Sequence, residues 1–479
     1  MSQSRRAAVV APASVSVSVS VSVSGAIVRS GTPGVFWPAV PGRSGADLMA
    51  QLYQLEHTQY FPPPLLRARQ LQQFAQLARH AAETCQFYEK RFAAARLDGA
   101  GPWTWERFGT LPVLTRRELL TQASQIHSQR PPESHGQWHE IQTSGSTGEV
   151  VAVRRTGVNQ LLWLALSMRD HIWHQRDFRK TLCVIRANID ARDDATTARE
   201  AGWGPPVTLL HETGPCYTRP LATDVAAQAQ WLIEKDPEYL LTYPTNLGGL
   251  IDHFEATGQR PSKLTEVRTI GETLPLALRT RCQAVLGVPI VDTYSAQEVG
   301  VIALQCPQSG LYHVHAESLI VEVLNPDGRA CAPGETGRVV ITDLHNFATP
   351  LIRYELRDYA EVGPTCPCGR ALPTLERVLG RQRNMVVLPN GQRYWPLVGL
   401  HHFRQVAQIL QYQLIQHDLE HVEMRLVVAT ALAPSAEARL TEIVQRALGH
   451  SFTIRFTYLE GELSRAASGK FEEFVSLVR

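Results

Sequence analysis

In the middle of this chain, short apolar runs alternate with stretches of helical length, and this alternation most constrains the fold. The apolar runs are residues 181–185, 239–242, 267–270 and 288–291, and the helical stretches are residues 224–234, 247–257 and 276–286. Strands that are separated by helices pair in parallel and carry the helices on the faces of their sheet. The alternation therefore predicts an α/β fold with a largely parallel sheet.

The regions on either side of this core have a different character. Upstream, residues 65–96 repeat apolar side chains at helical intervals, and Thr115 is placed to cap a further helix over residues 116–124. Downstream of Tyr312, the pattern predicts a β-rich section with little helix, with strands at residues 318–323, 337–342 and 358–362 and a hairpin over residues 386–394.

The first residues fit neither pattern. Ser14 to Ser24 alternate Ser and Val, but the surrounding Ala, Pro, Gly and Ser offer nothing that would bury the valines. The segment also lacks the continuous apolar core of a secretory signal. We predict a disordered low-complexity tail (residues 1–48), a large N-terminal domain of several subdomains (49–379) and a small α+β C-terminal domain (380–479).

Composition narrows the class of protein. The chain has 479 residues with a formal net charge of +2, so charge gives no argument for a nucleic-acid or membrane partner. No apolar run reaches the roughly 18 residues that a transmembrane helix needs. Eight cysteines are too few for a disulfide scaffold at this length, so a reduced, cytoplasmic protein is expected.

A loop of small residues joins two predicted strands and reads Thr143-Ser144-Gly145-Ser146-Thr147-Gly148. Glycine lets a backbone approach an anion closely, and hydroxyls and exposed amides donate hydrogen bonds, so the loop suits the phosphates of a nucleotide. It is not a Walker loop, because no Gly-Lys-Ser/Thr sequence ends it. Composition alone is equally compatible with a Ser/Gly linker.

A second segment, residues 292–300, follows the strand predicted at residues 288–291. Ligands of α/β sheets bind where strands end at their carboxyl side. Tyr294 offers a flat face for a base, and Glu298 offers an oxygen ligand for Mg²⁺. Taken alone, the segment is also compatible with a strand end that buries its tyrosine.

Three further segments each carry one charged residue of interest. Asp358 could accept hydrogen bonds from ribose hydroxyls, Arg381 follows a glycine where the β-rich section ends, and Lys470 follows Ser468-Gly469 near the C-terminus. Taken individually, Asp358 is also compatible with an ordinary surface acid, the turn at Arg381 with a linker, and Lys470 with a solvated charge.

In their order and spacing, these five segments resemble the motifs of the adenylate-forming superfamily, which includes acyl- and aryl-CoA ligases, luciferases and peptide-synthetase adenylation domains. The phrases at residues 111–115, 342–346 and 350–354 are similar to the phenylacetate–CoA ligase branch. The resemblance covers the chain from about Leu65 to its end. It implies an ATP- and Mg²⁺-dependent ligase that activates a carboxylic acid, aromatic in this branch, as an acyl-adenylate with release of pyrophosphate, and then transfers it to a thiol, usually that of CoA.

The resemblance also implies a role for each segment. Lys470, carried by a mobile C-terminal domain, would bridge the carboxylate and the α-phosphate, and Glu298 would hold Mg²⁺. Residues 143–148 would hold the β- and γ-phosphates. The other implied contacts are Tyr294, with the adjoining Ser295, on one face of adenine, Gly271, Glu272 and Thr273 on its other side, Asp358 on the ribose, and Arg381 on the ribose or phosphates.

The sequence departs from the family pattern in three places. Glu149 stands where many relatives have a lysine after the phosphate loop. Arg383 stands at the hinge position, which is often Asp or Lys in the family. Residues 388–396 replace the loop that helps to form the pantetheine tunnel, so a carrier-protein thiol or an amine is an alternative acceptor to CoA. A catalytically silent relative that binds a nucleotide is the alternative from another class of function.

Cysteines and a histidine form one more pattern. Cys306, His313, Cys366 and Cys368 have the ligand types and the surrounding Gly and Pro turns of a closed, tetrahedral, structural zinc site. His313 and His315 share a face of a predicted strand, so strand geometry does not choose between them, and we take His313 because it is nearer to the turn. The alternative is a set of free cysteines.

The residues of the acyl pocket are the part of the site that the sequence identifies least clearly. Tyr243, Pro244 and Trp203 are candidate walls, and His139 is a candidate substrate contact; ordinary packing is the alternative for each. The expected partners are a small carboxylic acid and CoA, a carrier protein or an amine, with no nucleic acid and no membrane. A homodimer is compatible with these expectations.

Overall fold

The computed structural model describes residues 28–97, 102–143, 150–189, 198–200, 202–381, 384–394, 396, 403, 406–428, 430–461, 463 and 471–478. The predicted phosphate-loop residues Ser144, Gly145, Ser146, Thr147 and Gly148 lie outside these ranges, as does Lys470. In the described part of the chain, no helix is both long enough and apolar enough to cross a bilayer.

The N-terminal part is helical, as the periodicity predicts. Its helices are α1 (Arg43–Thr58), α2 (Pro63–Thr84), α3 (Gln86–Ala94), α4 (Trp105–Gly109) and α5 (Arg116–Ile126), followed by the short 3-10 helix η1 (Glu133–His135). Helix α1 begins before residue 49, so the prediction of a disordered tail is wrong for residues 43–48. Leu48 and Leu55 lie on the same face of α1 and are buried against the core, which explains why these residues fold.

Thr115 caps α5 as predicted. Its hydroxyl accepts a hydrogen bond from the backbone N–H of Glu118, and the Glu118 carboxylate accepts one from the backbone N–H of Thr115 at 2.8 Å. This reciprocal capping box fixes where α5 starts and therefore where Arg116, its first residue, projects.

A twelve-stranded mixed sheet forms the centre of the large N-terminal part, in the order β11-β12-β13-β14-β10-β9-β8-β7-β6-β3-β5-β4. The neighbours from β8 to β5 in this order run parallel, and the remaining pairs are antiparallel. The strands are β3 (Leu182–Arg186), β4 (Ala198–Glu200), β5 (Cys216–Pro220), β6 (Tyr239–Thr242), β7 (Glu266–Ile270), β8 (Ile290–Ala296), β9 (Gly300–Gln305), β10 (Tyr312–Val314), β11 (Leu319–Leu324), β12 (Thr336–Asp343), β13 (Tyr354–Val362) and β14 (Thr374–Arg381). The predicted α/β core and β-rich section are thus confirmed, and they join edge to edge in one sheet.

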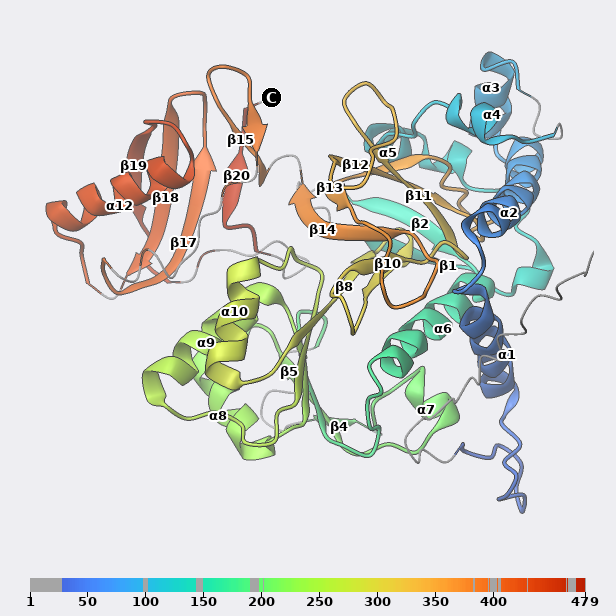
Figure 1. The fold of residues 1–479 in the computed structure, drawn as a ribbon, viewed down its shortest axis with the longest axis horizontal. Coiled ribbons are helices and arrows are strands. Elements are labelled where there is room, and N and C mark those ends of the chain that lie inside the picture. Colours follow the sequence, from blue (N-terminus) through green and yellow to red (C-terminus); the bar gives the residue numbers. More distant parts are fainter. Residues whose placement is uncertain are drawn as a thin grey trace, which may run out of the picture.

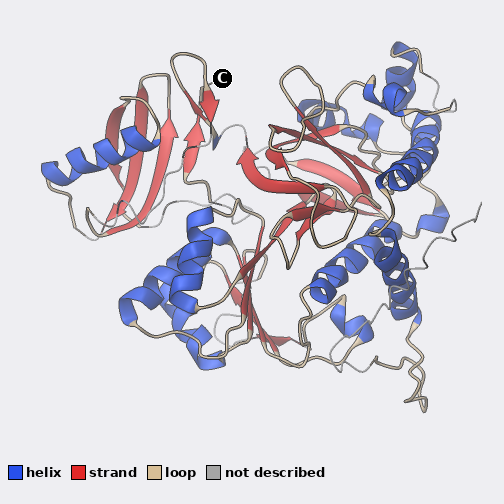
Figure 2. Cartoon of the chain, viewed as in Figure 1, coloured by secondary structure: helices blue, strands red, loops and turns tan. Residues whose placement is uncertain are grey.

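Helices cover the parallel part of the sheet, as Figures 1 and 2 show. They are α6 (Gly157–Trp173), α7 (Val207–Leu210), α8 (Val225–Lys235), α9 (Pro244–Thr257) and α10 (Leu276–Leu286). Helix α9 buries Leu247, Leu250, Ile251 and Phe254, which recur at helical spacing, in a core that also contains Val267 of β7. This packing holds the strand ends that lead into the candidate site.

Three smaller sheets complete the described fold. Strands β1 (His139–Thr143) and β2 (Val151–Arg155) form the hairpin that flanks the predicted phosphate loop, and β15 (Val386–Val387) pairs with β16 (Arg393–Tyr394) as predicted. The C-terminal sheet has the order β19-β18-β17-β20 and packs with α12 around its own core. Figure 1 shows this C-terminal part as a separate body beside α9 and α10. Its elements are β17 (Ile409–Gln416), β18 (His421–Val428), α12 (Pro434–Ala447), β19 (Thr453–Tyr458) and β20 (Phe474–Ser476).

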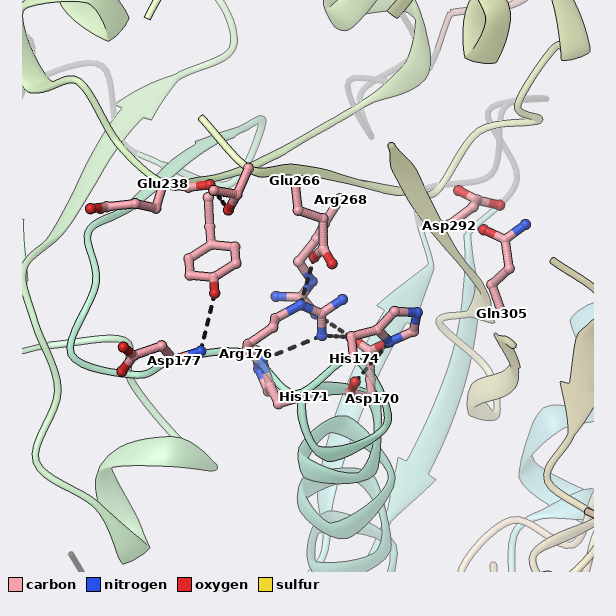
Figure 3. A network of polar contacts seen from close by, with 12 residues as sticks. Asp170, His171, His174, Arg176, Asp177, Glu238, Glu266, Arg268, Asp292 and Gln305 are labelled. Carbon is pink, nitrogen blue, oxygen red and sulfur yellow. Dashed lines mark hydrogen bonds and ion pairs between the residues drawn. The ribbon is translucent and has the colours of Figure 1, made fainter. Parts of the chain in front are cut away.

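A buried network of ion pairs ties the end of α6 to β7 (Figure 3). The Asp170 carboxylate accepts hydrogen bonds from Arg176 at 2.6 Å and from Arg268 at 2.8 Å, and the Nε of Arg176 donates to Glu266 at 2.6 Å. Asp170 and Arg176 are almost completely buried. Because Arg268 lies in β7, the network fixes the strand that runs into residues 271–273.

Candidate active site

Three predicted site residues meet on the large sheet, in which β13 and β14 are neighbours and β8 lies three positions beyond β14. The hydroxyl of Tyr294 in β8 donates to Asp358 Oδ2 in β13 at 3.0 Å. Arg381, the last residue of β14, faces Asp358 across the strand pair, with its Nε 3.7 Å from Asp358 Oδ1. Burial raises the pKa of Tyr294 well above its usual value, and the charge of Asp358 adds to the effect. The phenol is therefore a neutral donor that orients the carboxylate. Ser295 is the next residue of β8 and is half-buried.

The predicted magnesium ligand Glu298 has an unpredicted partner. Its Oε1 lies 2.9 Å from Nη1 of Arg116, and both side chains are 11% exposed, so water screens this pair weakly. Arg116 was missed because nothing local in the sequence links two residues so far apart in the chain. The phrase at residues 111–115 is the signal that could have identified Arg116. It positions the start of α5, and Arg116 is the first residue of that helix.

The turn that carries Glu298 is held from its other side by Arg155 at the end of β2. Nη2 of Arg155 donates to the carbonyl of Val299 at 3.1 Å. Gly300 has a φ of +86°, and a Cβ at this position would lie 2.8 Å from Arg155 Nη2. Only glycine allows both this backbone conformation and this approach, so two arginines from separate elements fix the Glu298 turn.

Glu272 follows β7 and connects the large sheet with the C-terminal part of the chain. Its carboxylate accepts hydrogen bonds from the backbone N–H of Thr245 at 2.9 Å and from the Thr245 hydroxyl at 2.8 Å, which caps the first turn of α9. Its Oε1 also accepts the backbone N–H of Phe471 at 3.0 Å. Phe471 directly follows Lys470 in the sequence, so the structure brings the chain next to Lys470 to the loop predicted to line adenine.

The residues on either side of Glu272 border the same region. Gly271 continues from β7, whose last residue, Ile270, pairs with Thr293 of β8, next to Tyr294. Thr273 packs tightly against Gly380, because a Cβ on Gly380 would lie 2.7 Å from the Thr273 hydroxyl oxygen. Gly380 precedes Arg381, so residues 271–273 lie between Tyr294 and the hinge region.

The candidate pocket walls fall in different places. Tyr243 and Pro244 are buried at the start of α9, beside the Thr245 cap that Glu272 completes. Trp203 packs against Tyr239, the first residue of β6, with ring centroids 5.2 Å apart, and so lies at the amino end of the parallel strands. This placement favours core packing for Trp203 over a place in the acyl pocket. His139 is exposed and pairs with Arg155, at the end of the β1–β2 hairpin away from the predicted phosphate loop.

The predicted zinc ligands are brought together. One ligand atom from each of Cys306, His313, Cys366 and Cys368 lies within 4.8 Å of the others, and three of the four residues are buried. The Sγ atoms of Cys306 and Cys366 are 3.7 Å apart, close to the edge of about 3.8 Å that a tetrahedron has when Zn–S bonds are about 2.3 Å. The geometry and the donor set therefore fit zinc.

His313, and not His315, faces this cluster. Nε2 of His313 lies 3.2 Å from Sγ of Cys368, whereas Nδ1 of His315 lies 3.2 Å from the guanidinium of Arg169. Although burial opposes ionisation of Cys306, hydrogen bonds from Ser309 and the backbone of Gln308 outweigh it and lower the pKa of Cys306 to about 7. A thiolate at this position is the form that binds a metal.

Sequence comparisons with known proteins match parts of the chain. Residues 395–476 match the family model described as the CapK C-terminal domain. A segment of 168 residues is 27% identical to the phenylacetate-coenzyme A ligase of Escherichia coli (strain K12), and one of 167 residues is 27% identical to that of Aromatoleum evansii. Each of these matches covers 34% of this chain and only 38% of the length of the relative.

Solved structures match over more of the chain. 2-Hydroxyisobutyryl-CoA ligase in the postadenylation state with 2-HIB-AMP superposes with a TM-score of 0.67, covering 87% of this chain and 90% of that chain at 18% identity. An anthranilate CoA ligase in complex with anthranoyl-AMP gives a TM-score of 0.51, covering 70% and 65% of the two chains at 13% identity. The chain therefore has the fold of these adenylate-forming ligases, and a third of it is similar in sequence to phenylacetate–coenzyme A ligases.

Proposed function

We propose that this protein is an AMP-forming ligase that activates a carboxylic acid with ATP as an acyl-adenylate, releases pyrophosphate, and transfers the acyl group to a thiol. The observation that carries the proposal is the convergence of Tyr294, Asp358 and Arg381 with Glu272, whose carboxylate binds the backbone next to Lys470. These residues come from distant parts of the sequence. Their meeting at the strand ends is what an adenylate site that closes with a small domain requires.

Each residue has a defined task in this proposal. Asp358, oriented by the Tyr294 hydroxyl, accepts hydrogen bonds from the ribose, and Tyr294 and Gly271 border the adenine. Glu298 would hold Mg²⁺, which neutralises phosphate charge when it is bound. Lys470 stabilises the negative charge that develops as the carboxylate attacks the α-phosphate. Residues 143–148 donate hydrogen bonds to the departing pyrophosphate.

Arg116 adds a positive charge to this list. Its guanidinium is paired with Glu298 and largely shielded from water. With Glu298 holding the metal, the Arg116 guanidinium would remain as a positive charge for the polyphosphate. Because position 149 is a glutamate instead of the lysine of many relatives, we propose that Arg116 supplies cationic charge to the triphosphate in place of that lysine.

We propose CoA as the acceptor, because the matched relatives and several structural neighbours are CoA ligases. A carrier-protein thiol or an amine is the second candidate, because residues 388–396 differ from the loop that helps to form the pantetheine tunnel in the family. We propose an aromatic acid on the sequence relationship to phenylacetate ligases. Tyr243 and Pro244 are the residues we propose for its pocket.

The test is ATP–pyrophosphate exchange with a panel of aromatic and aliphatic acids, followed by acceptor trials with CoA, carrier protein and amines. We expect at least one acid to support exchange that depends on both the acid and Mg²⁺. Tight ATP binding without exchange for any acid would overturn the ligase assignment and favour a silent nucleotide-binding relative. Transfer to an amine or a carrier protein, but not to CoA, would overturn the acceptor alone.

We further propose that Cys306, His313, Cys366 and Cys368 hold a structural zinc ion. We expect about one zinc per chain by elemental analysis after chelator-free purification. The double variant Cys366→Ser/Cys368→Ser should lose the metal and lower the unfolding temperature by about 5 °C or more, because the site clamps the loop between β13 and β14 to β10. Cys331→Ser, a cysteine remote from the cluster, is the matched control and should keep the zinc. A wild-type protein without zinc would contradict this prediction.

A further inference from the structure

The contact between Glu272 and Phe471 joins two rigid parts of the molecule. On the small-domain side, Leu414 of β17 donates its N–H to the Glu473 carbonyl at 2.8 Å, and the Gln413 side chain donates to the Glu472 carbonyl at 3.0 Å. Strand β20 then continues in parallel beside β17. The backbone at Phe471 is therefore an extension of the small sheet and moves with it.

On the large-domain side, Glu272 has little freedom. Its carboxylate accepts both the N–H and the hydroxyl of Thr245 at the start of α9, and α9 is packed into the core of the large domain. The same carboxylate reaches the Phe471 N–H at 3.0 Å. A hydrogen bond to a charged acceptor is about twice as strong as one between neutral groups. Glu272 is thus a fixed anionic acceptor presented to the small domain.

A second chain of contacts leads from the hinge to the same strand. Thr273, next to Glu272, packs against Gly380. The N–H of Arg381 donates to Asn384 Oδ1 at 3.2 Å, and Asn384 Nδ2 donates to the Phe474 carbonyl at 2.7 Å. The hinge backbone, β20 and residues 272–273 therefore form one connected junction between the two domains.

We infer that Glu272 is a positioning residue that docks the small domain on the large one through the Phe471 backbone, in the arrangement that serves adenylation. This inference rests on the proposed ligase function and deepens it. The Glu272 carboxylate acts through the Phe471 backbone and needs no contact with the nucleotide base. If the small domain rotates for the second half-reaction, this hydrogen bond must break, so Glu272 favours the arrangement that serves the first half-reaction only.

The test separates the two half-reactions in Glu272→Ala and Glu272→Gln. In Glu272→Ala, pyrophosphate exchange should fall about tenfold, because removing one charge-assisted bond shifts the docking equilibrium by about that factor. The consumption of a supplied acyl-adenylate by the acceptor should stay within about twofold of the wild type. Glu272→Gln keeps a carbonyl acceptor for the Phe471 N–H, so its rate of pyrophosphate exchange should lie between those of the wild type and Glu272→Ala. The matched control is Glu335→Gln, an exposed carboxylate in the turn before β12.

A second readout does not depend on activity. Hydrogen–deuterium exchange of a peptide covering residues 471–476 should be faster in Glu272→Ala than in the wild type, and the β17–β18 peptides should be unchanged. If no acid supports exchange in the wild type but this protection is lost, the ligase proposal fails while the docking role stands. Unchanged protection in Glu272→Ala, or an equal fall of both half-reactions, would overturn the docking role.

Discussion

Replacing Lys470 with alanine is expected to lower acid-dependent ATP–pyrophosphate exchange by about 10²- to 10³-fold. This is the loss that follows when one preorganised group that stabilises developing negative charge is removed from an active site. In the proposed reaction, charge builds where the acyl carboxylate meets the α-phosphate. The ammonium group of Lys470 is the cation that we place there.

The position of Phe471, the residue after Lys470, explains why the effect should be confined to the adenylation step. The Phe471 N–H binds Glu272 in the loop after β7, and that loop borders Tyr294 and the hinge. Lys470→Ala leaves these backbone contacts in place. The variant should therefore bind ATP with an affinity close to that of the wild type and should still transfer the acyl group from a supplied acyl-adenylate. The measurements are isotope exchange, ATP titration and single-turnover transfer.

A matched control separates the role of Lys470 from a general effect of charge. Lys263 is 64% exposed and pairs with Asp236 at the surface, so Lys263→Ala should exchange pyrophosphate at the rate of the wild type. Exchange by Lys470→Ala that equals that of the wild type would remove Lys470 from the chemistry. A parallel loss in both half-reactions would point to a damaged fold instead.

Local pattern predicted the elements of this fold well, because burial of one face leaves a periodic trace. The strand predicted at residues 239–242 and the helix predicted at residues 276–286 coincide with β6 and α10. The prediction that residues 43–48 belong to a disordered tail was wrong because no such local trace is present there. Those residues follow a low-complexity stretch, and the burial of Leu48 against distant elements decides their structure.

Contacts between segments that are distant in the sequence could not be predicted from local pattern. The pairing of Arg116 with Glu298 and the Asp170 network both join charged residues that, in sequence, are typical of a solvated surface. Trp203 shows the same limit, because Gly-Pro neighbours suggested a pocket wall and the fold buries its ring beside Tyr239. By contrast, the four proposed zinc ligands could be selected from the sequence, since metal ligands impose residue types and turns that are visible locally.

Replacing Asp170 with asparagine is expected to lower the free energy of unfolding by about 3–5 kcal/mol. Burial alone would raise the pKa of Asp170, but the guanidinium groups of Arg176 and Arg268 outweigh it and hold that pKa well below its usual value. The stabilisation is therefore fully present above the ordinary pKa of an aspartate and is lost as the pH falls below it. Asparagine keeps the shape of the side chain but leaves the two buried guanidinium groups with Glu266 as their remaining carboxylate in the network (Figure 3).

Two further variants show whether charge balance is the cause. Asp177→Asn removes the carboxylate that pairs with Arg179, whose side chain is 66% exposed, and should cost at most about 1 kcal/mol in urea-induced unfolding. Asp170→Asn/Arg268→Gln restores the charge balance and should recover part of the stability lost by Asp170→Asn. A loss below about 1 kcal/mol in Asp170→Asn would show that water reaches the network and screens it. Because Arg268 lies in the strand that leads to Glu272, a double variant that recovers stability but not pyrophosphate exchange would show that the network also sets the position of the docking loop.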